Sequence, residues 1–588
     1  MSSDLSFKRL RRLRLLFAGF AGLALVLVLA LAYWQILPGE RPETWMSEEE
    51  TGYRTRGSIL DCDGHYLALD AVVYEVDAYP NQITVTKTLT GAVALVDDLA
   101  AILDVDSDRV LQRFMERENR QIILGTFVDA DTGRRIEELG YAGIHLEPSY
   151  IRYYPEEELF GPVVGLTRWL SVTGVSGIEG YYKAELTGRD PKGWEGFSAS
   201  GTAEIGDGEE GRREGPGKPP RIADLPQVAD GADLYTTLDR NVQRIAYDAL
   251  AYGVNRSGAE RGLVIVMEPA TGKVRAVINY PSFDPNRYPE YWPDRSANLI
   301  DHSVRGTYEP GSVVKMMTVA AGVNEGLITA GTTFHDTGEI TIGTETLYNL
   351  GERAYGTVNT VEVLAHSLNV EAVAIAKMLQ PAVFYDYMRR FGFGESTRID
   401  LAGESPGELR VPGEPKWNLS DLGTNSYGQG VTVTPMLVVA AVSAVANGGR
   451  RMQPYVVERI VRGHDETIRE PQVACAEVIS RDTAEEVSRM LAQAVEMSIP
   501  KAKVPGYTVA GKSGTSQVVI GGQYHPTRTI ASFAGFAPAE DPRFAILVKL
   551  DTPRTSEFGA VVAAPVFSRV AEDLFQYYGI PPTSVRRS

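Results

Sequence analysis

The sequence predicts an α+β protein with a single N-terminal transmembrane helix ahead of two further regions. Three observations lead to this prediction. An uncharged apolar run follows a basic tail, and a polar loop rich in Gly, Glu and Pro interrupts the chain. Beyond the loop, strand-like segments come first, helical segments follow, and strands return before a final helix. We expect the strands of this last region to form one antiparallel sheet flanked by helices.

The apolar run covers residues 15–33 and is long enough to cross a bilayer as a helix. The basic residues before it are Lys8, Arg9, Arg11, Arg12 and Arg14. By the positive-inside rule, residues 1–14 form a cytoplasmic tail, residues 15–34 a single-pass anchor in the cytoplasmic membrane, and the rest is extracytoplasmic. A cleaved signal peptide is the alternative. It should have a shorter apolar region that ends at small residues, whereas this run ends at Tyr33 and Trp34, which favours an anchor.

The charge of the chain excludes some classes of partner. Its formal net charge is -18, so neither nucleic acid nor anionic lipid headgroups are expected as main partners. Cys62 and Cys475 form no pattern, and two buried thiols are favoured over a disulfide. The histidines are scattered, with no HExxH or CxxC motif. We therefore expect no metal and no cofactor.

The chain after the anchor divides at the polar loop. We expect a first domain over residues 45–193, a linker or insertion over 194–232, a second domain over 233–578 and a C-terminal tail over 579–588.

The second domain begins with a helix capped by Asp239. A strand pair over 263–267 and 274–278, a helix from Ser312, and a mostly helical section over 361–446 follow. Further strands are expected over 507–510, 517–520, 532–536 and 544–550, and a last helix begins at Pro565 and ends at Gly579.

The first motif with chemical potential is Ser312-Val-Val-Lys315. Pro310-Gly311 breaks the chain just before it, which places Ser312 in the first helical turn, where free backbone N–H groups can hold an oxyanion. Lys315 lies one turn further on the same face. Its neighbours are apolar, and a buried lysine beside a hydroxyl can lose its proton and act as a general base. An N-capping serine with a solvated lysine is the alternative.

A second motif, Ser367-Leu-Asn369, lies between two apolar helical segments. Alone it is typical of a turn with a capping serine. Beside a serine–lysine pair, Ser367 can relay a proton between the lysine and a leaving group, and Asn369 can hold a substrate amide.

A third motif is Lys512-Ser513-Gly514-Thr515. From Gly506 onward the letters also match the P-loop pattern of nucleotide-binding proteins. A P-loop needs a helix after its lysine, but the Gly514 and Gln517-Val-Val-Ile520 that follow favour a strand. As an edge strand, the motif supplies positive charge from Lys512 and hydroxyls from Ser513 and Thr515 for a carboxylate. Gly514 leaves space for a substrate backbone, and the N–H groups of Ser312 and Thr515 can form an oxyanion hole.

The three motifs together resemble those of class B penicillin-binding proteins, which are monofunctional peptidoglycan transpeptidases. The resemblance extends from the anchor to about Tyr577. It includes Arg56-Gly-Ser-Ile-Leu-Asp61, Arg152-Tyr-Tyr-Pro155, Gly177-Ile-Glu-Gly-Tyr-Tyr182, Glu309-Pro-Gly-Ser312, Phe391-Gly-Phe-Gly394, Gly428-Gln-Gly430, Ala446-Asn-Gly-Gly449 and Ser532-Phe-Ala-Gly-Phe536. Two positions depart from the family pattern, since Cys62 stands where the family usually has Arg and Ser367-Leu-Asn369 is a looser form of its motif.

This resemblance implies an elongated pedestal before the linker, for dimerisation or partner docking, and a transpeptidase domain with the serine β-lactamase fold after it. It implies that Ser312 attacks the penultimate D-alanine of a D-Ala-D-Ala stem peptide and that the acyl-enzyme passes to an amine of a neighbouring stem. β-Lactams would acylate the same serine. The implied partner is a membrane glycan polymerase of the shape, elongation, division and sporulation type. The short pedestal and the contexts of residues 391–394 and 426–430 favour a septal role in cell division over elongation and cell shape.

Two alternatives to this interpretation stay open. One is a β-lactam-hydrolysing or β-lactam-sensing protein on the same fold, although no deacylating base beyond Lys315 can be identified. The other is a non-catalytic scaffold of the division machinery, against which the complete set of motif residues argues.

Overall fold

The computed structural model describes residues 56–79, 82–83, 89–115, 121–167, 174–187, 231–291, 294–520 and 523–583. The predicted cytoplasmic tail, the predicted anchor and most of the predicted linker lie outside these ranges. Among the helices that the structure does describe, none combines the length and the apolar character that crossing a bilayer requires.

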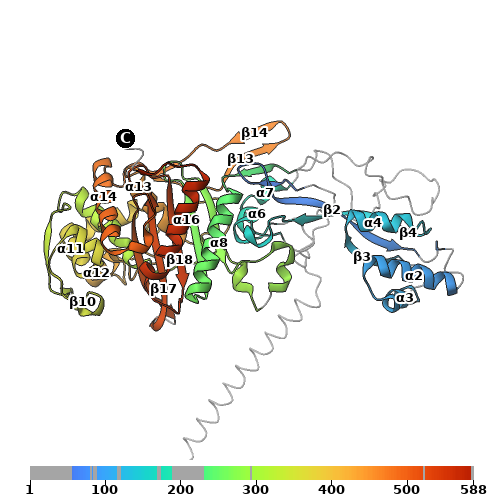
Figure 1. Cartoon of the computed structure of the whole chain (residues 1–588), viewed down its shortest axis with the longest axis horizontal. Helices are drawn as coiled ribbons and strands as arrows, with labels where there is room; N and C mark the ends of the chain where they lie inside the picture. Colours follow the sequence, from blue (N-terminus) through green and yellow to red (C-terminus); the bar gives the residue numbers. More distant parts are fainter. Residues whose placement is uncertain are drawn as a thin grey trace, which may run out of the picture. The chain divides into compact units, whose positions relative to one another are not determined.

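The N-terminal region combines strands with short helices (Figure 1). Its elements are β1 Ile59–Leu60, β2 Tyr66–Ala78, α2 Leu89–Leu103, α3 Ser107–Met115, β3 Ile122–Val128, α4 Ala130–Glu138, β4 Ile144–Tyr153, η3 Glu157–Leu159, α5 Gly161–Val164, α6 Gly177–Tyr181 and α7 Lys183–Leu186.

The C-terminal region carries the three motifs. Its elements up to α13 are β5 Asp233–Thr236, α8 Arg240–Ser257, β6 Arg261–Met267, β7 Val274–Tyr280, η5 Pro285–Tyr291, η6 Ser296–Leu299, η7 Gly311–Val314, α9 Lys315–Asn324, β8 Thr333–Asp336, β9 Glu339–Ile342, β10 Glu345–Tyr348, η8 Leu350–Glu352, β11 Gly356–Asn359, α10 Thr360–His366, α11 Asn369–Arg390, α12 Leu419–Ser426 and α13 Pro435–Ala446. The remainder are β12 Arg451–Met452, β13 Val457–Arg462, β14 Asp465–Ile468, β15 Val473–Cys475, α14 Arg481–Ser498, η9 Pro500–Ala502, β16 Ala510–Ile520, β17 Gln523–Ala537, β18 Phe544–Asp551, α15 Gly559–Val562 and α16 Ala564–Tyr577.

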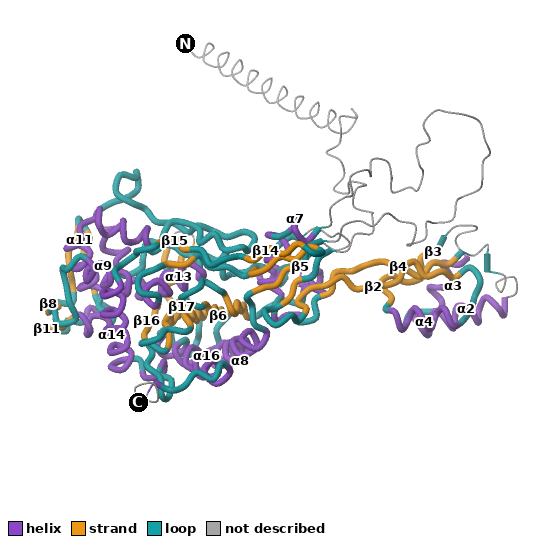
Figure 2. The backbone as a smooth tube through the Cα atoms, turned by 90° about the horizontal axis from the view of Figure 1, so that it is seen from above, coloured by secondary structure: helices purple, strands orange, loops and turns teal. Residues whose placement is uncertain are grey.

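The predicted antiparallel sheet is confirmed. Five strands pair in the order β16-β17-β18-β6-β7, and every pairing is antiparallel. Both faces of β6 are buried, because Val264 and Val266 face the cluster formed with α8 and α16, whereas Leu263 and Ile265 belong to the cluster on the other face with α9 and α13. Helices therefore cover both sides of this sheet, as Figure 2 shows for α8 and α16 below β6 and β17 and for α13 above them.

The helix boundaries follow the predicted signals closely. Asp239 caps α8, since its carboxylate accepts hydrogen bonds from the N–H groups of Asn241 at 2.9 Å and Val242 at 3.2 Å. The final helix, α16, ends at Tyr577, just before Gly579, whose φ of 60° is left-handed. Two strand predictions were wrong in detail. The strand expected over 507–510 begins only at Ala510, and it continues without a break through the segment expected over 517–520 as β16, so the third motif lies inside a strand.

The cysteine expectation was half right. Cys62 and Cys475 are both free, so the described residues contain no disulfide between them. Both are only half-buried, and not buried as the sequence predicted, because each lies on a short segment with one side open to solvent.

A second sheet joins segments from both sides of the predicted linker. Its strands run in the order β14-β13-β5-β1-β2-β3, with β4 also paired to β2. β1 pairs parallel to β5, which also pairs with β13. A buried carboxylate supports this junction, since Asp400 accepts hydrogen bonds from the N–H groups of Val456 at 2.8 Å and Val457 at 2.9 Å and from the Tyr182 hydroxyl at 2.7 Å.

A buried ionic cluster connects three elements of the N-terminal region. Glu179 of α6 is fully buried and accepts hydrogen bonds from Arg56 Nε at 2.6 Å and Arg152 Nε at 2.7 Å. Asp70 of β2 also contacts Arg152, at 3.0 Å. Burial alone would raise the pKa of the Glu179 carboxyl, but the two arginines outweigh burial and lower it. The cluster thus holds β2, β4 and α6 together.

We predict that Glu179→Gln lowers the free energy of unfolding by about 3–5 kcal/mol, because it leaves two buried guanidinium groups without their shared anion. The matched control is Asp131→Asn, which removes an exposed ion pair with Arg134 and should change little. Urea unfolding of both variants at neutral pH measures this. Because the folded-state pKa of Glu179 is lowered, the difference between wild type and Glu179→Gln should shrink as the pH falls through that pKa. Equal effects for the two variants would contradict the prediction.

Candidate active site

The Ser312 side chain lies at the junction of two helical segments. Ser312 is in the short 3₁₀ helix η7, and Lys315 begins the buried helix α9 directly after it. Gly311 precedes the serine with a φ of 57°, and its N–H donates to the carbonyl of Gly428 at 3.0 Å. A side chain at residue 311 would contact the carbonyl oxygen of Thr515 at 2.8 Å. Glycine therefore allows the serine turn to approach both the loop at Gly428 and the strand β16.

Lys315 is fully buried, and its amine contacts groups from both of the first two motifs. Its Nζ lies 3.1 Å from Ser312 Oγ, 2.5 Å from the Ser367 carbonyl oxygen, 3.1 Å from Ser367 Oγ and 2.7 Å from Asn369 Oδ1. Burial lowers the pKa of Lys315 well below its ordinary value, and the nearby charge of Lys512 lowers it further. A neutral amine has two N–H groups to donate to Ser367 and Asn369, and a lone pair that can accept the Ser312 proton.

The backbone of Ser367 has a strained conformation that brings two of its oxygen atoms close to Lys315. Ser367 ends α10 with a φ of 59° and ψ of 46°, a left-handed conformation that a non-glycine residue seldom adopts. This conformation lets its carbonyl oxygen and its hydroxyl both reach Lys315. Asn369 begins α11, and its Nδ2 donates to the carbonyl of Tyr348 at 2.9 Å, which fixes the amide with its oxygen toward Lys315.

The third motif lies on β16, which is an edge strand of the sheet as predicted. Strand alternation directs Lys512 to one face, where it is 1% exposed, and the half-buried Ser513 and Thr515 to the other. Lys512 Nζ donates to the Ser513 carbonyl at 3.2 Å, and burial lowers its pKa to about 7. Since a strand and no helix follows Lys512, the P-loop pattern in this segment is not a nucleotide-binding loop.

Gly514 also has a structural role that the sequence did not predict. A side chain at this position would come within 2.5 Å of Ser532 Oγ, 2.8 Å of the Pro310 carbonyl oxygen and 3.1 Å of Val313 Cγ2. The space on this side of Gly514 is thus occupied by Ser532 and by the turn that carries Ser312. The glycine lets the edge strand pack directly on the nucleophile turn.

Sequence reasoning missed four residues that surround the motifs. Tyr427 places its ring 6.0 Å from Lys315 Nζ, and Glu309 accepts hydrogen bonds from Gly430 N at 2.9 Å and the Tyr524 hydroxyl at 3.1 Å. Asn349 and Glu371 lie next to Asn369. Asn349 stands in a segment without a recognisable pattern. Glu309 and Tyr427 lie in segments that resemble the family, and the carboxyl of Glu371 inside an otherwise apolar helix was a usable signal.

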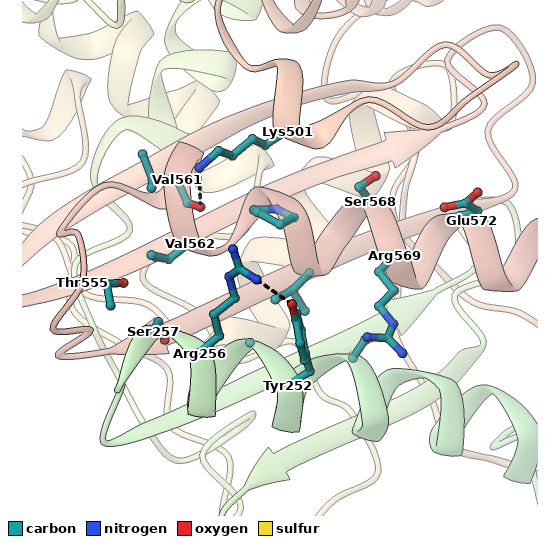
Figure 3. A pocket seen from close by; sticks show the side chains of 14 residues that line it. Tyr252, Arg256, Ser257, Lys501, Thr555, Val561, Val562, Ser568, Arg569 and Glu572 are labelled. Carbon is teal, nitrogen blue, oxygen red and sulfur yellow. Dashed lines mark hydrogen bonds between the residues drawn. The ribbon is translucent and has the colours of Figure 1, made fainter.

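A separate cleft of about 640 Å³ lies between α8 and the C-terminal helices (Figure 3). Its rim carries Arg256, Lys501 and Arg569, all exposed, and none of the eight residues predicted for the site lines it. Arg256 donates to the Tyr252 hydroxyl at 2.7 Å and Lys501 to the Val561 carbonyl at 3.4 Å. Arg256 and Lys501 thus both have partners within the protein.

Comparison with known proteins agrees with this geometry. Residues 262–572 match the model of the penicillin binding protein transpeptidase domain, and residues 52–210 match the penicillin-binding protein dimerisation domain. The chain is 30% identical to stage V sporulation protein D of Bacillus subtilis, over 97% of this chain and 86% of that protein. It is 27% identical to the peptidoglycan D,D-transpeptidase FtsI homologue of Mesostigma viride, over 96% of this chain and 95% of that one.

Solved structures show the same fold. Penicillin-binding protein 3 of Mycobacterium tuberculosis in complex with aztreonam superposes with a TM-score of 0.68 at 25% identity, over 90% of this chain and 97% of that one. The chain therefore belongs to the penicillin-binding proteins with a transpeptidase domain, and its dimerisation domain places it in class B. Within this class it is similar to the division-type members.

We predict that Gly514→Ala slows acylation of Ser312 by a β-lactam about 100-fold or more, because the new methyl group displaces the serine turn. The same overpacking should cost roughly 1–3 kcal/mol of stability. Gly331→Ala is the matched control, since nothing lies within 4 Å of a side chain there. The measurements are the rate of labelling by a fluorescent penicillin and thermal unfolding. Wild-type labelling by Gly514→Ala would show that the strand can move without disturbing Ser312.

Proposed function

We propose that this extracytoplasmic peptidoglycan D,D-transpeptidase forms its acyl-enzyme on Ser312 and crosslinks stem peptides at the site described above. The observation that carries the proposal is the position of Lys315 Nζ, fully buried and within hydrogen-bond distance of Ser312 Oγ, Ser367 Oγ and Asn369 Oδ1. One amine thus touches the proposed nucleophile and the proposed proton relay.

In the first half-reaction, neutral Lys315 takes the Ser312 proton as Oγ attacks the carbonyl carbon of the penultimate D-alanine. The backbone N–H groups of Ser312 and Thr515 stabilise the oxyanion of the tetrahedral intermediate. As the intermediate collapses, the C–N bond breaks, and the proton passes from Lys315 through Ser367 Oγ to the departing D-alanine amine. Ser312 is left as an ester of the stem peptide.

In the second half-reaction, an amine of a neighbouring stem attacks this ester. The proton released by the amine returns through Ser367 and Lys315 to Ser312 Oγ, so the crosslink forms without external energy. Asn369 holds an amide of the substrate, the hydroxyls of Ser513 and Thr515 bind the terminal carboxylate of the donor, and Lys512 supplies positive charge. A carboxylate bound there favours the charged form of Lys512, whose pKa of about 7 leaves it only partly protonated in the free enzyme.

We further propose that residues 45–193 form a pedestal that docks with division proteins, among them a membrane glycan polymerase, and that residues 15–34 anchor the chain in the cytoplasmic membrane. The match to a dimerisation domain over residues 52–210 supports the first part. The apolar run after a basic tail supports the second. β-Lactams are expected to acylate Ser312 because they mimic the donor peptide, as the aztreonam complex of the M. tuberculosis relative suggests.

The test is labelling of the purified extracytoplasmic part with a fluorescent penicillin, followed by mass spectrometry of the labelled peptide. We expect a stable adduct on Ser312 in the wild type and none in Ser312→Ala, because Ser312 Oγ is the proposed nucleophile. The adduct should persist for minutes or longer, as suits a transpeptidase. Fast turnover would favour a β-lactam hydrolase. In cells, normal crosslinking with Ser312→Ala as the sole copy would favour a scaffold.

A further inference from the structure

Glu371 is a buried carboxyl that the proposed reaction does not use. It is the third residue of α11, two positions after Asn369, and its side chain is 2% exposed. Among the described residues, its Oε2 atom has no hydrogen-bond partner. Ionising a carboxyl that is buried in this way costs much free energy. The protein must therefore keep the group neutral or give its charge a function.

The neighbour of Glu371 is a second buried carboxyl, Asp336, at the end of β8. β8 packs against α11, and Asp336 raises the pKa of Glu371 through its charge and through a hydrogen bond between the side chains. Asp336 also accepts hydrogen bonds from Gly338 N at 3.0 Å, Tyr355 N at 2.8 Å and Asn349 Nδ2 at 2.9 Å. Glu371 Oε2 has no such donor in the described part of the chain, so we place the proton between the two carboxyls on Glu371.

This carboxyl pair connects directly to the second motif. Asn349, which donates to Asp336, accepts hydrogen bonds through its Oδ1 from the backbone N–H groups of Asn369 at 2.8 Å and Val370 at 3.1 Å. It thereby caps α11 from a distant loop. The same turn presents Asn369 Oδ1 to Lys315 Nζ at 2.7 Å. A change in the position or in the charge of this turn therefore changes the surroundings of the Lys315 amine.

We propose that Glu371 is a positioning residue for the transpeptidase reaction, which shares one proton with Asp336 and thereby sets the charge that Lys315 meets. With the proton in place, the pair carries a single negative charge that is neutralised by the donors around Asp336, and Lys315 stays a neutral base. When the proton leaves, a second charge appears beside Lys315 and favours its ammonium form. The inference rests on the proposed role of Lys315.

The electrostatics agree with this arrangement. Burial, and after it the charge of Asp336, raise the pKa of Glu371 to about 7, while Lys315 opposes the rise. In turn, an ionised Glu371 raises the pKa of Lys315, against the effects of burial and Lys512. On the other elements packed against α11, Glu339 of β9 and both Glu345 and Tyr348 of β10 are exposed, and Asp421 of α12 pairs with Arg410.

The test is the pH profile of Ser312 acylation by a fluorescent penicillin, compared between the wild type and Glu371→Gln. Glutamine keeps the shape and can donate to Asp336, but it cannot ionise. Lys315 in the variant should then lose its proton more readily, and the midpoint of the rising limb should move to lower pH by roughly half to one unit. A purely structural role would lower the rate at every pH without moving the midpoint.

Glu362→Gln is the matched control, because Glu362 is the third residue of α10 as Glu371 is of α11, and it caps only its own helix. Its profile should keep the wild-type midpoint. An unmoved midpoint in Glu371→Gln, or a move to higher pH, overturns the proposal. If the wild type itself is not acylated on Ser312, the proposed function fails instead, so the two failures are distinguishable.

A second measurement covers the case in which Glu371→Gln does not fold. Infrared spectra of the wild type near pH 6 should contain the carbonyl band of a protonated carboxylic acid shielded from water, and part of that band should disappear between pH 6 and pH 8 as Glu371, with its pKa of about 7, loses its proton. A spectrum in which this band does not change over that interval overturns the shared-proton arrangement.

Discussion

Burial of the Lys315 amine determines the arrangement of the groups around it, because an amine removed from water must find its hydrogen-bond partners within the protein. Three segments meet at this one atom. The 3₁₀ turn η7 supplies Ser312, the end of α10 supplies Ser367, and the start of α11 supplies Asn369. The strained backbone of Ser367 is tolerated because the surrounding packing leaves it no alternative.

The sheet contributes to the same site by bringing an edge strand against a helical turn. Gly311, Gly428 and Gly514 are the points of closest approach, and at each of them a side chain would meet backbone atoms of a neighbouring segment within 2.8 Å. The order β16-β17-β18-β6-β7 places β16 at an edge of the sheet, so the strand that carries the third motif pairs with a neighbour on one side only. An extended peptide can add to such an edge as a further strand.

The sequence predicted much of this arrangement because several of its signals are local. The cap at Asp239, the turn at Pro310-Gly311 and the alternating or continuous apolar runs indicated the α+β order, and the first two motifs supplied the residues that contact Lys315. Contacts set by tertiary packing were not predictable in this way. The role of Gly514 depends on which segment faces it, and the link from Asp336 through Asn349 to Asn369 joins residues far apart in the chain, with no motif to mark it.

The position of β5 has a consequence for the modularity of the protein. This short strand follows the predicted linker, yet it pairs with β1 from before the linker on one side and with β13 from the C-terminal region on the other. A protein divided at the linker would therefore lose the pairing between β1 and β5, because these strands lie on opposite sides of the cut. The edge of β5 exposed in this way would promote aggregation. If a transpeptidase region is exchanged between relatives, β1, β5 and β13 must therefore come from the same protein, or their sequences must still allow the three strands to pair.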